Sequence, residues 1–151
     1  MKRLIIIFIL LNIVGCNEEP ACCDSIAEFP RIKVLDSNNL DLLDPENYDH
    51  FDHSDISMST VIDSNLQNLN LEIRRVLLSV SDSGDYFINV NDNMVGILTS
   101  DGIKHFYLNL NNSDTDTISL LIENSTTKRL ELNGQRWRDY NSLDFTYIIR
   151  K

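Results

Sequence analysis

Apolar and polar residues alternate along most of the chain beyond residue 28, which is the pattern of β-strands that bury one face. Ile32 and Val34 alternate with charged residues, and Phe106, Leu108 and Leu110 share one face of a later segment. The pattern predicts about eight to ten short strands. Their expected positions are residues 30–34, 56–62, 86–90, 94–99, 103–111, 117–123, 128–132, 135–140 and 145–149.

Residues 66–80 fit two patterns. Their alternation changes phase after Ile73, which a β-bulge at Arg74-Arg75 would explain. A helical stripe that begins at Leu66 fits the same apolar residues. We favour a strand because the surrounding segments are β, and a helix remains the alternative.

Turn signals separate the strands, and Asn133-Gly134 is the clearest two-residue hairpin signal. Residues 36–55 read as a long loop. Short strands with turns between them and no convincing helices predict an all-β fold. We expect a single antiparallel β-sandwich, immunoglobulin-like or transthyretin-like, and parallel α/β folds are excluded. The loop residues expected to pack under the sheet are Leu40, Leu42 and Leu43.

The first sixteen residues follow a different pattern. Lys2 and Arg3 precede an apolar run over residues 4–11, which is about half the roughly 20 residues that a membrane-spanning helix needs. The run therefore reads as the apolar region of a signal peptide. The segment then closes with Ile13-Val14-Gly15-Cys16, which resembles the lipobox of bacterial lipoproteins, with Ile13 where Leu is commoner.

The lipobox resemblance implies that the sulfur of Cys16 takes a diacylglycerol and that Cys16 becomes the mature amino terminus. Each buried CH₂ of an acyl chain contributes about 0.8 kcal/mol, so membrane lipid would hold the protein through acylated Cys16 without a spanning helix. The expected organisation is a lipoprotein signal peptide (1–15), a lipidated tether (16–27) and a β-sandwich domain (28–151).

Cys22 and Cys23 are poor rivals for lipidation because Glu18 and Glu19 precede them and no apolar run adjoins. Both lie in the predicted tether, so they cannot crosslink the folded domain. Their redox state stays open between two free thiols, a strained disulfide between neighbours, and pairing with another chain.

The chain is acidic, with 13 Lys and Arg against 23 Asp and Glu. Loss of Lys2 and Arg3 with the signal peptide makes the mature charge −12. A surface this acidic repels nucleic acid and anionic headgroups, so we expect no nucleic-acid partner. A cation or a basic partner would match the charge, although solubility alone explains it.

Five short motifs follow one another along the chain: Asp41–Pro45, Asp55-Ile56, Phe106–Leu110, Asp114–Ile118 and Asn133-Gly134. Their order resembles the small lipoproteins with a β-sandwich domain that are common in Bacteroidota. That resemblance implies a compact β-sandwich on a lipid tether and no particular activity. Asn17-Glu18-Glu19 after Cys16 resembles the acidic surface-export signal of such bacteria. The expected location is the bacterial outer membrane or cell surface, with the periplasmic face as the alternative. Ser25 in the predicted tether is a candidate O-glycosylation site.

The densest polar cluster is Asp49–Asp55, where His50 and His53 lie among carboxylates. Imidazoles suit zinc and carboxylates suit calcium, but a solvated acidic loop is the preferred interpretation. Asp36–Asp41 has a calcium-loop spacing, yet Leu40 stands where an oxygen ligand is needed. We therefore predict no metal site and no cofactor.

No catalytic motif is recognisable, and His105 is expected to be a partly covered surface histidine. The leading hypothesis is a non-enzymatic, lipid-anchored binding or assembly module of the cell envelope with a glycan or protein partner. A small envelope glycan or peptide hydrolase and a calcium-dependent adhesion domain are the alternatives. Aromatic residues that could contact a partner, with core packing as the default, are Tyr48, Phe51, Phe87 and Tyr140, and Trp137 is expected in the core.

Overall fold

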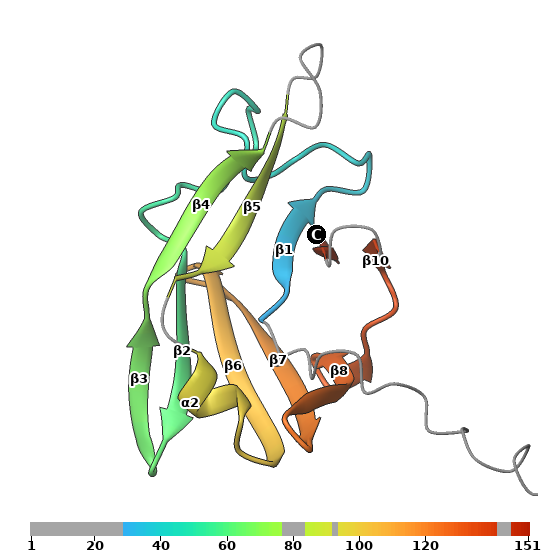
Figure 1. The fold of residues 1–151 in the computed structure, drawn as a ribbon. Coiled ribbons are helices and arrows are strands. Elements are labelled where there is room, and N and C mark those ends of the chain that lie inside the picture. The colour runs from blue at the N-terminus through green and yellow to red at the C-terminus, as the bar shows by residue number, and fades with distance from the viewer. Residues whose placement is uncertain (1–28, 77–83, 92–93, 142–145) are drawn as a thin grey trace, which may run out of the picture.

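The computed structural model describes residues 29–76, 84–91, 94–141 and 146–151, and within them two β-sheets pack face to face (Figure 1). This confirms the predicted all-β sandwich. Sheet A contains, in spatial order, β10 (Tyr140–Asn141), β11 (Thr146–Arg150), β1 (Arg31–Leu35), β5 (Asp85–Val90) and β4 (Leu71–Val76). Sheet B contains β3 (Asn65–Leu69), β2 (Ser57–Ile62), β6 (Gly102–Asn111), β7 (Asp114–Glu123), β8 (Thr126–Leu132) and β9 (Gln135–Arg136).

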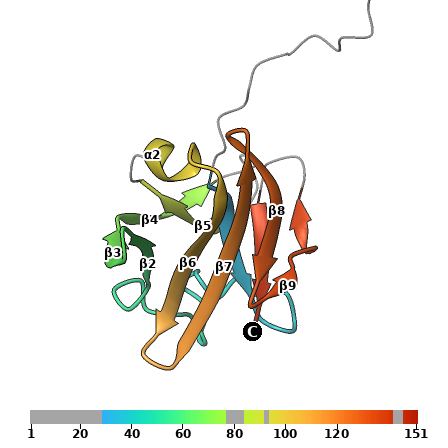
Figure 2. The same cartoon turned by 90° about the horizontal axis from the view of Figure 1, so that it is seen from below.

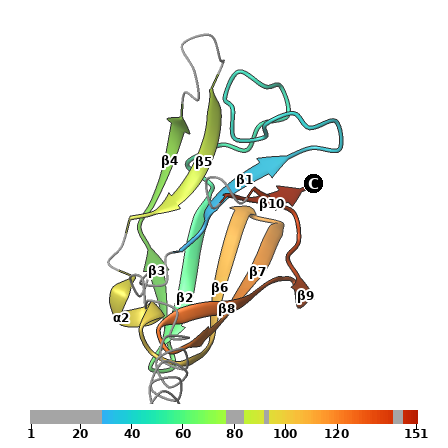
Figure 3. The same cartoon turned by 45° about the vertical axis from the view of Figure 1, so that its right-hand side comes forward.

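The core lies between the two sheets, where alternate residues of each strand point inward. In sheet B the predicted inward face of β6 is confirmed, since Phe106, Leu108 and Leu110 are fully buried. Figure 3 shows β1, β4 and β5 of sheet A above β2, β6 and β7 of sheet B. Each buried aliphatic or aromatic side chain contributes about 1.5–3 kcal/mol to folding. Further fully buried core residues are Ile32, Val34, Ile118, Leu120 and Ile122.

The first and last described strands lie side by side. β1 pairs in parallel with β11, from Arg31 opposite Thr146 to Leu35 opposite Arg150. The other strand pairs in the described part of the chain are antiparallel. Because parallel neighbours need a crossover, the chain must pass through sheet B before β11 returns beside β1.

Residues 65–69 and 71–76 form strands, which confirms the preferred interpretation over the helical one for the part that is described. The chain leaves sheet B at the end of β3 and enters sheet A at the start of β4, with Asn70 between them. The predicted bulge at Arg74-Arg75 is wrong, because β4 pairs with β5 in continuous register through both residues. The change of sheet at Asn70 accounts for the irregular apolar pattern.

The strand predicted over residues 94–99 is wrong. Residues Val95–Leu98 form a short helix, α2, on the connection from β5 to β6. Met94 accepts hydrogen bonds at its carbonyl from the N–H groups of Ile97 and Leu98. Met94 and Leu98 are both buried in the core, so a helical turn buries the apolar residues that the predicted strand would have buried.

The long loop after β1 is only partly tucked under the sheet as predicted. Leu42 and Leu43 are buried in the core, but Leu40 is 53% exposed. The N–H of Leu42 donates to the carbonyl of Val34 at 2.9 Å, which folds the loop back onto β1. Asp36 holds the turn before it, since its Oδ1 accepts the N–H groups of Asn38 and Leu40.

The hairpin at Asn133-Gly134 is confirmed, and both residues have the positive φ angles that a tight hairpin turn requires. The single strand predicted over residues 135–140 is wrong, because it divides into two. β9 ends at Arg136 in sheet B, and β10 begins at Tyr140 in sheet A. Residues 137–139 therefore connect sheet B to sheet A along one side of the sandwich.

Candidate functional site

A groove of about 420 Å³ lies on the side of the sandwich where the chain crosses from β9 to β10. We call it the basic groove because four of its eight lining residues are Lys or Arg. In Figure 2, β8 and β9 lie together at one edge of sheet B, next to β7. The lining residues are Thr127, Lys128, Arg129, Leu130, Arg136, Trp137, Arg138 and Tyr147.

The Asn133-Gly134 hairpin brings the basic residues together. It folds β9 back on β8 so that Arg136 lies opposite Glu131. The N–H of Trp137 then donates to the carbonyl of Leu130 at 3.0 Å, which extends the pairing by one residue. Lys128 and Arg129 of β8 therefore face the same groove as the returning segment.

A β-bulge sets the position of Lys128. In the pairing of β7 with β8, Leu121 lies opposite Arg129 but the next residue of β7 lies opposite Thr127. Lys128 is thus the extra residue of β8, and it is exposed. Bulges commonly re-aim a side chain at a site, which fits the place of Lys128 on the groove wall.

Trp137 and Tyr147 form the aromatic floor of the basic groove. The two rings lie 4.9 Å apart between centroids, at an interplanar angle of 56°. The indole Nε1–H of Trp137 donates to the carbonyl of Ile148 at 2.9 Å, and only 8% of the residue is exposed. Trp137 is therefore in the core, as predicted, and also fixes the shape of the groove.

The cations on the rim are exposed, and most have no acidic partner within the described residues. Arg129 forms an ion pair with Glu131 at 3.0 Å. In the part of the chain that the structure describes, Lys128, Arg136 and Arg138 form no ion pair. Because guanidinium groups fit carboxylate and phosphate in a bidentate way, the basic groove is suited to an anion.

A second hollow, of about 330 Å³, lies on the other side of the Arg136–Arg138 segment. Its wall includes Arg150, whose Nε donates to Asp139 at 2.7 Å while its Nη1 donates to Asn39 at 2.7 Å. These contacts occupy Asp139. Asp139 is therefore held by Arg150 of β11 and forms no ion pair with Arg136 or Arg138.

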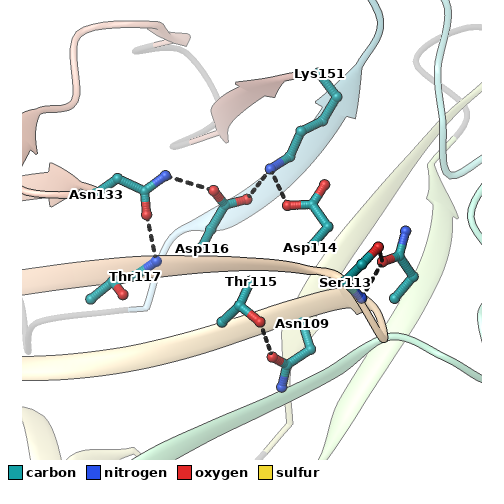
Figure 4. A network of polar contacts seen from close by, with 9 residues as sticks. Asn109, Ser113, Asp114, Thr115, Asp116, Thr117, Asn133 and Lys151 are labelled. Atoms are coloured by element: carbon teal, nitrogen blue, oxygen red, sulfur yellow. Dashed lines mark hydrogen bonds and ion pairs between the residues drawn. The ribbon is translucent and has the colours of Figure 1, made fainter.

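A separate polar cluster joins the end of β11 to sheet B (Figure 4). The Nζ of Lys151 donates to Asp114 and lies 2.7 Å from Oδ2 of buried Asp116. The Asn133 amide donates to the other oxygen of Asp116 and accepts the N–H of Thr117. Burial opposes the charge of Lys151, but the two carboxylates outweigh it and raise the pKa of Lys151. We call Lys151 with Asp114 and Asp116 the Lys151 clasp, and we interpret it as a cluster that stabilises the fold.

The predicted polar cluster Asp49–Asp55 does not converge. His50 Nδ1 lies 2.7 Å from the carbonyl of Asn47, and His53 Nε2 lies 2.6 Å from the carbonyl of Leu43. The N–H and hydroxyl of Ser54 donate to Asp52 and lower the pKa of that carboxyl. Within the residues described, no group of three His, Cys, Asp or Glu side chains is arranged to hold a metal ion.

The acidic residues at 36–41 shape the loop. The N–H of Leu40 is the main cause that lowers the pKa of Asp36, with a further contribution from the N–H of Asn38. Asp41 is half-buried, and burial raises its pKa even though it accepts the N–H groups of Tyr86 and Leu43. Both carboxylates are thus committed to backbone hydrogen bonds.

The aromatic candidates from the sequence scatter over the fold. Tyr48 is 96% exposed, Phe51 packs against the core and Phe87 is buried. The side chain of Tyr140 lies outside those that the structure describes. His105 is exposed, and its Nδ1 lies 2.9 Å from the hydroxyl of Ser119. These residues form no common site.

The predicted leader and tether lie outside the described residues. That part includes Cys16, the candidate lipidation site, as well as Cys22, Cys23 and Ser25. A search of the described residues finds no helix with the length and apolarity that a bilayer crossing demands.

Sequence reasoning missed the basic groove, although a signal was present. Lys128-Arg129 and Arg136-Trp137-Arg138 lie on the two sides of the Asn133-Gly134 turn. A hairpin at that turn places two basic segments next to one another in an acidic chain. The contribution of Tyr147 carried no such signal because β11 belongs to the other sheet.

Comparison with known proteins gives no match to a family model, and no curated protein or solved structure reaches significant similarity to this chain.

Proposed function

We propose that this chain is a lipid-anchored lipoprotein of the bacterial cell envelope, at the outer membrane or cell surface. The support comes from the sequence: two cations, an apolar run and Ile13-Val14-Gly15-Cys16, in the order of a lipoprotein leader. The Bacteroidota-type motifs support the same location. The periplasmic face is the alternative position for the same anchor.

The folded domain acts as a non-enzymatic binding module, and the basic groove is its binding site. The observation that carries this proposal is the concentration of exposed cations over an aromatic floor in a chain of net charge −10. A volume of about 420 Å³ falls in the range of small-molecule sites, about 300–1,000 Å³. Guanidinium groups stay protonated, so they hold an anion by charge and hydrogen bonds without transferring a proton.

The anchor is tested by labelling cells with a palmitate analogue. We expect the full-length protein to incorporate the label and Cys16→Ser to lose it. Cys22→Ser is the matched control, since it removes a thiol six residues away and should keep the label. Continued labelling of the Cys16→Ser protein would overturn the lipid anchor.

The groove is tested by photo-crosslinking in intact cells. Replacement of Lys128, which is exposed and lines the basic groove, by p-benzoylphenylalanine should give an adduct of reproducible mass, because three cations of the groove remain. The same replacement of Tyr48, which is 96% exposed on the loop between β1 and β2 and does not line the groove, is the control and should give none. Absence of any adduct from position 128 would show that the basic groove binds nothing in the envelope.

A further inference from the structure

We infer that the basic groove takes an acidic saccharide: a short sugar that carries a carboxylate or a phosphate. The inference rests on the proposed function, because it names the ligand class of the same groove. It follows from the floor, the rim and the charge of the surrounding surface, which each restrict the ligand in a different way.

The floor of the groove favours a ligand with an apolar face. Trp137 is fixed by its hydrogen bond to the carbonyl of Ile148 and by its contact with the ring of Tyr147. Leu130 adds an aliphatic side chain to the same lining. Aromatic side chains with fixed positions offer contact area at a low cost in conformational entropy. The C–H face of a sugar ring is a suitable partner for such a floor.

The rim of the groove favours an anionic substituent. Arg136 and Arg138 are separated by one residue, and Lys128 and Arg129 stand on the facing strand. Two neighbouring acids already have partners. Glu131, opposite Arg136, pairs with Arg129, and Asp139, next to Arg138 in the sequence, pairs with Arg150. An incoming carboxylate or phosphate therefore meets exposed donors without displacing an ion pair of Arg136 or Arg138.

The surrounding charge favours a compact ligand. The chain has a net charge of −10, yet four of its 13 Lys and Arg residues line this one groove. Outside the groove, the chain has nine Lys and Arg against 23 Asp and Glu. A long polyanion such as nucleic acid, or a flat anionic membrane, would extend past the groove and meet this excess of negative charge, which repels it. A short acidic saccharide keeps its charge within reach of the rim.

The groove contains the only tryptophan of the chain, so its fluorescence reports binding at this place. We would titrate the full-length protein in a neutral detergent with cellobiouronic acid and with cellobiose, which differ by one carboxylate. Inorganic phosphate and glycerophosphoglycerol, the deacylated headgroup of an anionic lipid, are the other probes. We expect saturable binding of the acidic disaccharide, at least tenfold tighter than each of the other three.

The variants Arg136→Gln and Arg138→Gln should each weaken binding of the acidic disaccharide about tenfold. Both side chains are exposed, so the fold should survive, and an unchanged thermal midpoint checks this. Arg74→Gln is the matched control, because it removes an exposed arginine from β4 at the far edge of sheet A. It should leave binding unchanged.

Three results would overturn the inference: equal binding of cellobiose, equal or tighter binding of phosphate or the lipid headgroup, or no response to any probe. In each case the crosslinking test decides the proposed function separately. An adduct at position 128 would keep the groove as a site for a different ligand, whereas its absence would remove both conclusions.

Discussion

At the scale of single residues, Lys151 shows how one side chain can join the two sheets. Its Nζ contacts Asp114 and Asp116 of β7, while its backbone N–H donates to the carbonyl of Leu35 in β1. Asp116 is 2% exposed, so loss of Lys151 would leave a buried carboxylate without its cation.

We predict that Lys151→Met destabilises the fold by about 1–3 kcal/mol, less than a fully buried pair would cost because Lys151 is partly exposed. Urea denaturation measures the change. The raised pKa of Lys151 means that its contribution is complete below about pH 10.5, its unfolded value, and is lost as pH rises through the folded value. The difference in unfolding free energy between the wild type and Lys151→Met should therefore shrink at high pH. Asp114→Asn, which removes only the more exposed partner, should cost less, and equal costs would contradict the clasp.

The contribution of Asp41 to stability should fall as pH rises, which is opposite to the behaviour of a carboxylate whose pKa is lowered by folding. Because burial raises its folded pKa above 3.8, the folded state retains a proton that the unfolded state has lost. Its contribution to stability is therefore greatest at low pH and falls as pH rises through the raised pKa. We predict that the deficit of Asp41→Asn in urea denaturation shrinks from about pH 4 toward neutral pH.

Asp36→Asn is the control of opposite sign. Backbone hydrogen bonds lower the pKa of Asp36, so its contribution is present above 3.8 and is lost as pH falls. The deficit of that variant should grow as pH rises. Parallel pH profiles for the two variants would contradict the assigned environments.

The burial of a single residue can be predicted from the sequence where the residue lies in a strand with a clear apolar alternation. Trp137 and the inward residues of β6 were predicted correctly, because alternation within one strand determines which face they share. Leu40 was predicted wrongly to be covered, since a loop has no periodicity to fix its direction. The exposure of a loop residue depends on where the chain turns, and here Asp36 sets that turn.

At the scale of elements, the β8–β9 hairpin is the unit that both the fold and the groove depend on. Gly134 has a φ of 76° and open space where a Cβ would lie, so substitution there meets no atom but strains the backbone. We predict that Gly134→Ala costs about 1–2 kcal/mol in thermal or urea denaturation.

Gly96→Ala is the control for Gly134→Ala, because it adds the same methyl group without backbone strain. Gly96 also has open space around its missing Cβ, but it lies in α2, where alanine is favoured. That variant should be neutral or slightly more stable. A similar loss in both variants would mean that the turn geometry at Gly134 is not the cause.

Element types followed from the sequence where the alternation was long, and failed where a short apolar run fitted two periods. Met94 and Leu98 are four residues apart, which is a helical spacing as well as a strand spacing, and the helix forms. The change of sheet at Asn70 left no separate signal because β3 and β4 both read as strand. Pairing partners, not local pattern, decide such boundaries.

At the scale of the whole molecule, the basic groove exists only because distant segments meet. β8 and the Arg136–Arg138 segment follow one hairpin, but Tyr147 reaches the groove from sheet A. The parallel pairing of β1 with β11 places that residue, since Ile32 lies opposite Tyr147. A single sequence indicates the hairpin but not the crossover, which explains why the fold class was predictable and the groove was not.

The same pairing makes the last six residues essential to the whole sandwich. Removal of residues 146–151 would take away the parallel partner of β1, the buried side chain of Ile149 and the clasp of Lys151. We predict that the truncated chain loses its cooperative thermal transition, because sheet A loses a central strand and Ile32 and Val34 lose their neighbours. Fluorescence of Trp137, which donates to the carbonyl of Ile148, should shift to the red as the indole meets water. Deletion of Lys151 alone keeps β11 and should leave a cooperative transition at a lower midpoint. If the longer truncation also melted cooperatively, sheet A would not depend on β11, and the groove floor would need another support.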